Sequence, residues 1–142
     1  CLPSSDVVMK VVQDCGDNFT KEHVIIDTGT GSPEEVSRVS EMLNSIGASF
    51  FEATIAGSSE LLKKKKAQLF LSGDKDLIDR ESDLIDSLTE KSFYLGALGM
   101  ASRFKLVHNL IIGLNRAVLA EGLQFAESYG FDSKEVLLKA SA

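Results

Sequence analysis

The feature that most constrains the fold is an alternation of short apolar runs with helical patterns, which stops near residue 96. Runs rich in β-branched and aromatic residues predict four strands: HVIID (23–27), ASFFEATIAG (48–57), AQLFLSG (67–73) and KSFYLG (91–96). Patterns with helical spacing precede, separate and follow these runs. This order predicts an α/β domain with a largely parallel sheet.

The helices of this first part carry recognisable end signals. Residues 4–16 have a valine stripe, with Ser4, Ser5 or Asp6 as the N-cap. In 32–47, Ser32 is expected to cap the helix, Glu35 to complete a capping box and Gly47 to end it. Residues 74–88 place five leucines and isoleucines on one face, which predicts a single helix. SSELLKKKK (58–66) is expected to be a short polar or helical link.

After residue 99 the chain changes character. Residues 100–129 form one long helical pattern without proline, and a shorter helix follows FD at 131–132. A domain boundary is therefore predicted at 96–99, with an all-α segment after it. Apolar residues surround the axis of the long helix, so its first half is expected to be buried nearly all round.

A polar stripe interrupts this apolar helix. At about 100° per residue, Ser102, Lys105, Asn109 and Arg116 share one narrow strip, with His108 at its edge. Burial would depress the pKa of Lys105 and make its amine usable as a proton donor or acceptor. The spacing is equally consistent with a Lys105 side chain that extends along the helix to solvent. His108 taken alone is typical of a hydrogen-bonded core histidine.

Two other motifs favour plain structural interpretations. HVIIDTGTG (23–31) imitates a dinucleotide-binding fingerprint, but Glu34 stands where the third glycine belongs. Acidic residues at a helix start oppose a pyrophosphate, so we interpret the motif as a tight turn. The four lysines at 63–66 could bind a polyanion, yet a charge run is more often a solvated face.

Composition narrows the classes of partner and location. The net charge of −6 argues against a nucleic-acid or anionic-membrane partner. Two cysteines make neither a disulfide framework nor a zinc site, which predicts a reducing, intracellular and cytoplasmic setting without metal. No secretory signal and no stretch of about 18 apolar residues is found. The chain begins Cys-Leu-Pro without methionine, so we expect it to start within a longer protein.

Together, FFEATIAGSS (50–59) and GALGMASRFKLVHNL (96–110) resemble the β-hydroxyacid dehydrogenases. This family includes the 3-hydroxyisobutyrate, tartronate semialdehyde, L-threonate and 6-phosphogluconate dehydrogenases. Its substrate motif is D-A-P-V-S-G-G and its catalytic motif is G-x-G-x-x-x-K-x-x-N-N. CLP at the start and AEGLQFAESYGFD (120–132) also resemble family segments.

The resemblance implies roles for individual residues. Lys105 matches the catalytic lysine and Asn109 the catalytic-site asparagine. The implied substrate-binding residues are Gly57, Ser58, Ser59 and His108, and the implied cofactor-binding residues are Leu2, Pro3 and Thr30. The chain departs from the substrate motif at Glu52, Thr54, Ala56 and Ser58, and from the catalytic motif at Ala101 and His108. Without a hydroxyl at Ala56, Ser58, Ser59 or backbone N–H groups would have to bind the substrate carboxylate.

The implied fold is the C-terminal half of a Rossmann-type NAD-binding domain (1–98) followed by the start of an all-α domain (99–142) with a long interdomain helix. A glycine-rich loop is expected before Cys1 and further helices after Ala142, so the segment alone is expected to be inactive. The implied reaction passes hydride between a 3-hydroxy acid and NAD or NADP. His108 points to a four-carbon sugar acid such as L-threonate, and the long helix to a homo-oligomer. The alternative is a non-catalytic, dehydrogenase-like oligomerisation domain of a larger protein.

Overall fold

The computed structural model describes residues 2 and 4–140. The chain divides into two compact units, Cys1–Lys105 and Leu106–Ala142, each of which is described by itself. The first unit contains the sheet and most of the helices, and the second consists of the rest of the long helix and a short final one. No helix within 2 and 4–140 combines the length and apolarity needed to cross a membrane.

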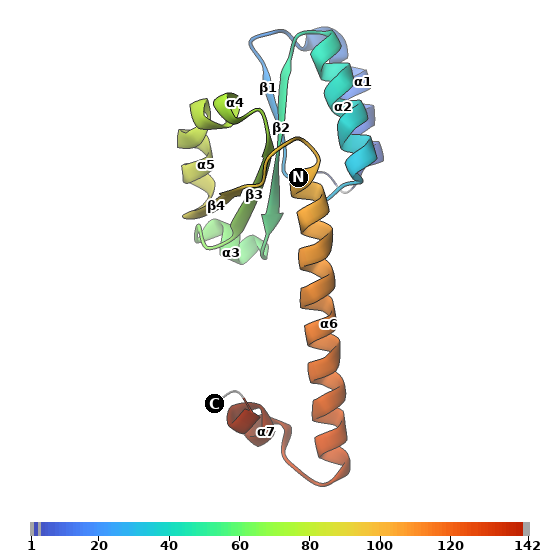
Figure 1. Ribbon diagram of the computed structural model, residues 1–142, viewed down its shortest axis with the longest axis vertical. Helices are drawn as coiled ribbons and strands as arrows, with labels where there is room; N and C mark the ends of the chain where they lie inside the picture. The colour runs from blue at the N-terminus through green and yellow to red at the C-terminus, as the bar shows by residue number, and fades with distance from the viewer. Residues whose placement is uncertain (1, 3, 141–142) are drawn as a thin grey trace. The chain divides into compact units, whose positions relative to one another are not determined.

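A four-stranded sheet forms the centre of the first unit (Figure 1). Its strands, in spatial order, are β1 (Val24–Asp27), β2 (Ser49–Ala56), β3 (Gln68–Gly73) and β4 (Lys91–Tyr94). The β1–β2 and β3–β4 pairs are parallel as expected, but β2 and β3 are antiparallel. Only residues 57–67 separate these two strands, and a parallel connection needs a crossover of a dozen residues or more.

Seven α-helices and one 3₁₀ turn complete the described part of the chain. They are α1 (Ser5–Cys15), η1 (Gly16–Asn18), α2 (Pro33–Ser45), α3 (Ser59–Lys63), α4 (Lys75–Arg80), α5 (Ser82–Leu88), α6 (Met100–Ser128) and α7 (Ser133–Ala140). The single helix expected over 74–88 is therefore wrong, because the chain breaks at Glu81 into α4 and α5.

The capping box expected at the start of α2 is also wrong. The Ser32 hydroxyl donates to Glu34 at 2.6 Å and caps no N–H group. The Ser32 backbone N–H, which Glu35 would accept in a capping box, donates instead to Ser5 Oγ of α1 at 3.1 Å. The Ser32 N–H therefore bonds to a residue of α1 and not to Glu35 of its own helix.

The sheet is covered on both faces. Helices α1 and α2 lie on one face and α4 and α5 on the other (Figure 1). Alternation along β2 divides the core, since Phe50 packs with the first pair of helices and Phe51 with the second. Both phenylalanines are buried, so β2 lies at the centre of a three-layer packing.

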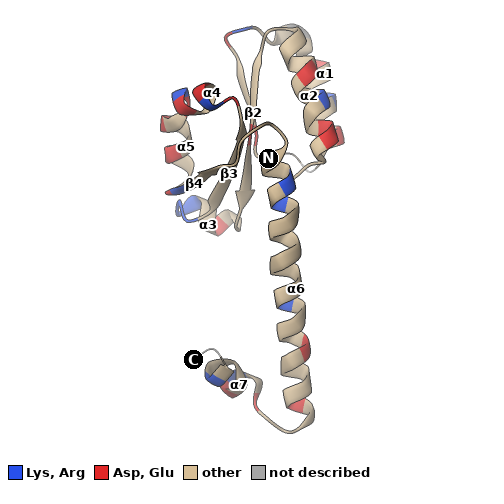
Figure 2. Ribbon diagram, viewed as in Figure 1, with Lys and Arg blue, Asp and Glu red and all other residues tan. Residues whose placement is uncertain are grey.

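Burial of α6 is confined to its beginning. Ala101, Ser102 and Lys105 are its buried residues. Beyond them most of the apolar side chains are exposed, from 37 % at Ile112 to 71 % at Val118. The expectation that the first half is buried nearly all round is therefore wrong, because the buried residues all belong to the first two turns. Figure 2 shows how few charged residues this helix carries.

Candidate functional site

A buried carboxylate anchors the start of α6 to the sheet. Glu52, in the middle of β2, is 1 % exposed. Its Oε2 accepts from the Gly99 N–H at 2.6 Å and from the Ser72 hydroxyl, and its Oε1 accepts from the N–H (3.2 Å) and the hydroxyl of Ser102. The Ala101 N–H donates to Ser72 Oγ at 3.0 Å. Negative charge therefore meets the positive end of the helix dipole, and N–H groups that lack helical partners are satisfied.

Lys105 lies one turn further along the same side of α6 as Ser102. The residue is 7 % exposed, and the loss of hydration lowers the pKa of its amine below the ordinary value. Within residues 2 and 4–140, nothing forms a hydrogen bond or ion pair with Lys105. Lys105 is thus a buried residue whose amine has no hydrogen-bond or ion-pair partner in the part of the chain described.

The sheet beneath Lys105 is mostly apolar. Ala56 and Phe70 form one buried cluster with Ala101, and Phe104 stacks edge-on against Phe70 with ring centroids 4.6 Å apart. Thr54, two residues after Glu52 on the same face of β2, is 1 % exposed, and its hydroxyl has no hydrogen-bond partner in the part of the chain described. The surroundings therefore favour an uncharged amine.

The three expected substrate-loop residues are consecutive and exposed, Gly57 and Ser58 in the turn after β2 and Ser59 at the start of α3. Gly57 has φ of 148°, and a β-carbon there would lie 3.1 Å from Ala67 Cβ, so the position requires glycine. Ser58 caps α3, its hydroxyl accepting from the Leu61 N–H at 3.3 Å, and Ser59 is exposed. The turn leaves the Ser59 hydroxyl and backbone groups available to a ligand.

Asn109 and His108 belong to the part of α6 in the second unit. Asn109 is exposed and lies one turn after Lys105, so the two share a side of the helix, while His108 is half-buried. The structure joins Lys105 to these two residues through α6 alone.

Two of the three expected cofactor-binding residues lie at the carboxyl end of β1. Leu2 and Thr30 are both exposed, and Pro3 falls outside the described residues. A β-carbon at Gly29 would be 3.6 Å from the Leu2 carbonyl oxygen, so Leu2 lies against the turn that follows β1. Ligands of open α/β sheets bind outside the carboxyl ends of the strands. These residues therefore fit one side of a nucleotide site.

This turn does not suit a pyrophosphate. A hydrogen bond from Ser32 lowers the pKa of Glu34, with help from its own backbone N–H and from the positive charges of Arg103 and Arg38. An ionised carboxylate thus stands at the first turn of α2, where a phosphate would need positive potential. The interpretation of residues 28–31 as a tight turn agrees with this charge.

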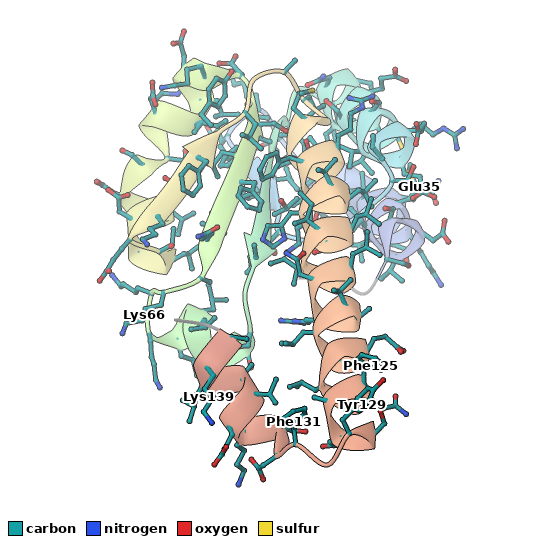
Figure 3. The ribbon with its side chains drawn as sticks, turned by 60° about the horizontal axis from the view of Figure 1, so that its bottom comes forward. Glu35, Lys66, Phe125, Tyr129, Phe131 and Lys139 are labelled. Carbon is teal, nitrogen blue, oxygen red and sulfur yellow. The ribbon has the colours of Figure 1, made fainter. Side chains whose placement is uncertain are left out.

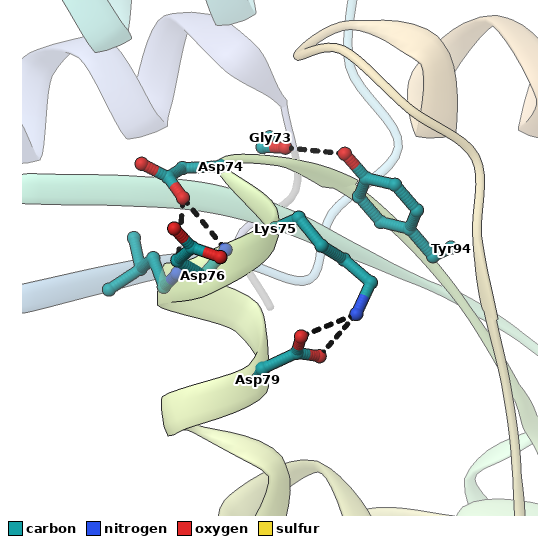
Figure 4. A network of polar contacts seen from close by, with 7 residues as sticks. Gly73, Asp74, Lys75, Asp76, Asp79 and Tyr94 are labelled. Carbon is teal, nitrogen blue, oxygen red and sulfur yellow. Dashed lines mark hydrogen bonds and ion pairs between the residues drawn. The ribbon is translucent and has the colours of Figure 1, made fainter.

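The charged residues at the start of α4 have structural roles. In Figure 4, Asp74 caps α4 through the N–H groups of Asp76 and Leu77, while Lys75 pairs with Asp79 at 2.5 Å.

Within the second unit, a pocket of about 520 Å³ lies between the end of α6 and α7, lined by Phe125, Tyr129, Phe131 and Lys139 among others (Figure 3). Across residues 2 and 4–140, no group of three or more His, Cys, Asp or Glu side chains could hold a metal.

Sequence reasoning missed the anchoring role of Glu52 and the part played by Ser72. A signal for it was present, because FFEATIA places a carboxylate inside an apolar strand pattern. What the sequence lacked was the partner, since Gly99 and Ser102 lie 47 and 50 residues further along the chain.

Comparison with known proteins identifies the family. Residues 1–96 match the family described as the NAD binding domain of 6-phosphogluconate dehydrogenase. Glyoxylate/succinic semialdehyde reductase 1 of Arabidopsis thaliana is 30 % identical over 112 residues, which are 79 % of this chain and 39 % of the reductase. The cytokine-like nuclear factor N-PAC of Xenopus tropicalis is 30 % identical over 113 residues, 80 % of this chain and 21 % of that protein.

A solved structure supports the fold. The 3-hydroxyisobutyrate dehydrogenase of Mycobacterium tuberculosis, determined with L-serine, superposes with a TM-score of 0.84 at 21 % identity, over 92 % of this chain and 45 % of that one. The chain spans about two fifths of the length of the plant reductase. It belongs to the 6-phosphogluconate dehydrogenase type of NAD-binding domain, with the fold of the 3-hydroxyisobutyrate dehydrogenases and a cofactor of the NAD or NADP class.

Proposed function

We propose that the whole protein is an NAD(P)-dependent oxidoreductase that interconverts a β-hydroxy acid and its carbonyl form. The observation that carries this proposal is Lys105, buried without a protein partner and with a lowered pKa. An amine with a lowered pKa can take the proton of a substrate hydroxyl, or return it to a carbonyl oxygen. A bound nicotinamide would supply the hydride acceptor or donor.

The other residues bind and orient in this proposal. Leu2 and Thr30 contact the cofactor at the carboxyl end of β1. Backbone N–H groups and the Ser59 hydroxyl in the turn after β2 bind the substrate carboxylate, and Asn109 orients the substrate from the helix that carries Lys105. His108 favours a four-carbon sugar acid such as L-threonate as the substrate, by resemblance to the enzymes that act on such acids.

Steady-state kinetics of the whole protein test the role of Lys105. Lys105→Ala should lower kcat by about 10² to 10⁴-fold, the usual contribution of a positioned acid or base, and leave cofactor affinity unchanged. Lys105→Arg should not restore turnover, because a guanidinium stays protonated. Substrates would include L-threonate, 3-hydroxyisobutyrate, glyoxylate and succinic semialdehyde. Lys10→Ala, at an exposed lysine of α1, is the matched control. Wild-type kcat in Lys105→Ala would refute the assignment.

A specific observation favours the alternative of a non-catalytic domain. Ala56 offers no hydroxyl to a substrate carboxylate, and Ser58 uses its hydroxyl to cap α3. A relative of similar identity is described as a nuclear factor rather than as an enzyme. If the whole protein binds NAD or NADP but turns over none of the four substrates, this alternative replaces the enzymatic one.

We also propose that α6 mediates association between copies of the protein. Apolar side chains along it, among them Leu110, Leu114 and Val118, are more than half exposed. Exposed apolar surface of this extent marks interfaces. Leu110→Glu should shift the sedimentation of the whole protein towards smaller species, while Arg116→Glu, at an already charged position, should not. A strictly monomeric wild type would contradict the proposal.

A further inference from the structure

We propose that Glu52 is a positioning residue, whose carboxylate sets the place of Lys105 by fixing the first turn of α6 to the centre of the sheet. This inference deepens the proposed function and rests on it. Glu52 replaces the aspartate of the family's substrate motif, so contact with the substrate would be the obvious role. The geometry indicates a different one.

Contact between Glu52 and a substrate is blocked by burial and by the hydrogen bonds it already accepts. The side chain is 1 % exposed, and each oxygen accepts two hydrogen bonds. A carboxylate has about four acceptor sites, so no site is left for a ligand. Whatever Glu52 does for the reaction, it does through the groups that donate to it.

Those donors define the orientation of α6. Gly99 and Ser102 donate backbone N–H groups to different oxygens of the same carboxylate. Two attachment points three residues apart fix both the depth of the helix end and its rotation about the axis. Ser72 adds a third, because its hydroxyl donates to Glu52 and accepts from the Ala101 N–H at 3.0 Å. Lys105 follows Ser102 by three residues and inherits this orientation.

Lys105 depends on this anchor because no hydrogen bond or ion pair of its own orients its amine. Nothing described in the chain pairs with its amine, so helix rotation decides both where the amine lies and how much water reaches it. The charged groups at this end of α6 are Arg103 on the helix, Glu34 and Arg38 on α2, and Glu52 itself. A displacement of about 1 Å far from the reacting atoms can cost on the order of 10² in rate.

Glu52→Gln is the sharpest test because it keeps the shape and changes one acceptor into a donor. Whichever oxygen the amide nitrogen replaces, it faces a backbone N–H, from Gly99 on one side or Ser102 on the other. A serine hydroxyl can rotate to accept, but a backbone N–H cannot. One attachment point must therefore open. In Ser102→Ala the backbone N–H still donates to Glu52, so this variant should be affected much less.

The experiment measures two properties of the whole protein for the wild type and three variants. The first is kcat, KM and cofactor affinity. The second is the pH dependence of reductive methylation at Lys105, followed by peptide mass spectrometry, which reports the pKa of that amine without any turnover. Ile78→Ala, in the core on the opposite face of the sheet, is the control for general destabilisation. Urea unfolding establishes that each variant is folded under the assay conditions.

We expect Glu52→Gln to lower kcat by about 10²-fold, with KM and cofactor affinity within about twofold of wild type. Its methylation profile should move to higher pH, as hydration returns to Lys105. Ser102→Ala and Ile78→Ala should keep the wild-type methylation profile. The inference is overturned if folded Glu52→Gln keeps both wild-type properties, or if Ile78→Ala changes them equally. If the wild type turns over no substrate, the proposed function fails, and the methylation profiles alone decide the role of Glu52.

Discussion

Replacement of Lys105 by methionine should stabilise the protein at neutral pH. Methionine has nearly the same shape, can occupy the same apolar space and needs no partner. Burying a polar group without a hydrogen bond costs about 1 to 3 kcal/mol in mutational data, and Lys105 has no partner in the described chain. We therefore expect Lys105→Met to raise the free energy of unfolding at pH 7, by at most about 3 kcal/mol.

The gain should depend on pH with a defined sign. Burial lowers the pKa of Lys105 in the folded protein from 10.5, the value of the unfolded chain. Between the two pKa values the unfolded chain binds more protons, so the stability of the wild type rises with pH across this window, by about 1.36 kcal/mol for each unit of difference. Below the window the penalty is fully present, and above 10.5 it is gone. The advantage of Lys105→Met should therefore shrink as the pH rises.

Urea unfolding of the whole protein at pH values from 7 to about 10.5 measures this difference. Subtracting the free energy of unfolding of the wild type from that of Lys105→Met removes the contributions of the other titrating groups. Lys10→Met, at an exposed lysine of α1, is the matched control and should show no pH-dependent difference from wild type. A constant difference for Lys105→Met over the whole range would mean that the lysine is hydrated in solution, and the reasoning from its burial would be refuted.

Three core changes give further tests by urea unfolding. Thr54→Val should stabilise the protein by up to about 1 kcal/mol, because it removes a buried hydroxyl without a described partner, and a loss of stability would reveal such a partner. Gly31→Ala should cost about 1 to 3 kcal/mol, because its β-carbon would overlap Ser5 Oγ, the acceptor for the Ser32 N–H, and Ser5→Ala should add little in that background. Leu43→Ala, at a fully buried position of α2, should cost about 2 to 5 kcal/mol.

Local sequence signals were sufficient for most elements of the first unit. The four strands form where apolar runs were bounded by turn residues, as for β1 at HVIID and β3 at AQLFLSG. The failures have different causes, one of which is competition from a residue distant in sequence. Ser32 loses its capping box because Ser5, on another helix, takes its N–H. The parallel direction of the strands was predicted only from the alternation of strands with helices. That pattern does not take into account that the β2–β3 connection is too short for a crossover.

The candidate site was predictable only in its residue types. Helical spacing marked Lys105 as unusual and allowed two alternatives, burial of the residue or extension to solvent. In the structure the residue is buried. Spacing could not show where burial ends, because a helical pattern does not reveal which turns pack against other elements. Leu106 and Lys105 are neighbours in sequence, yet one is half exposed and the other is 7 % exposed. The apolar residue is the exposed one, contrary to the usual preference.

The start of α6 shows why a site of this kind escapes local rules. Its first turn contains Arg103 and no acidic residue, the reverse of the charge that stabilises a helix start. The missing negative charge comes from Glu52, across 47 residues of sequence to Gly99. A cap supplied by the helix itself would move with it, whereas a cap in the central strand ties the helix to the most buried part of the sheet. Because β2 fixes where α6 begins, the position of this helix does not depend on favourable contacts of Lys105. We infer that a lysine whose burial costs stability can therefore be retained there.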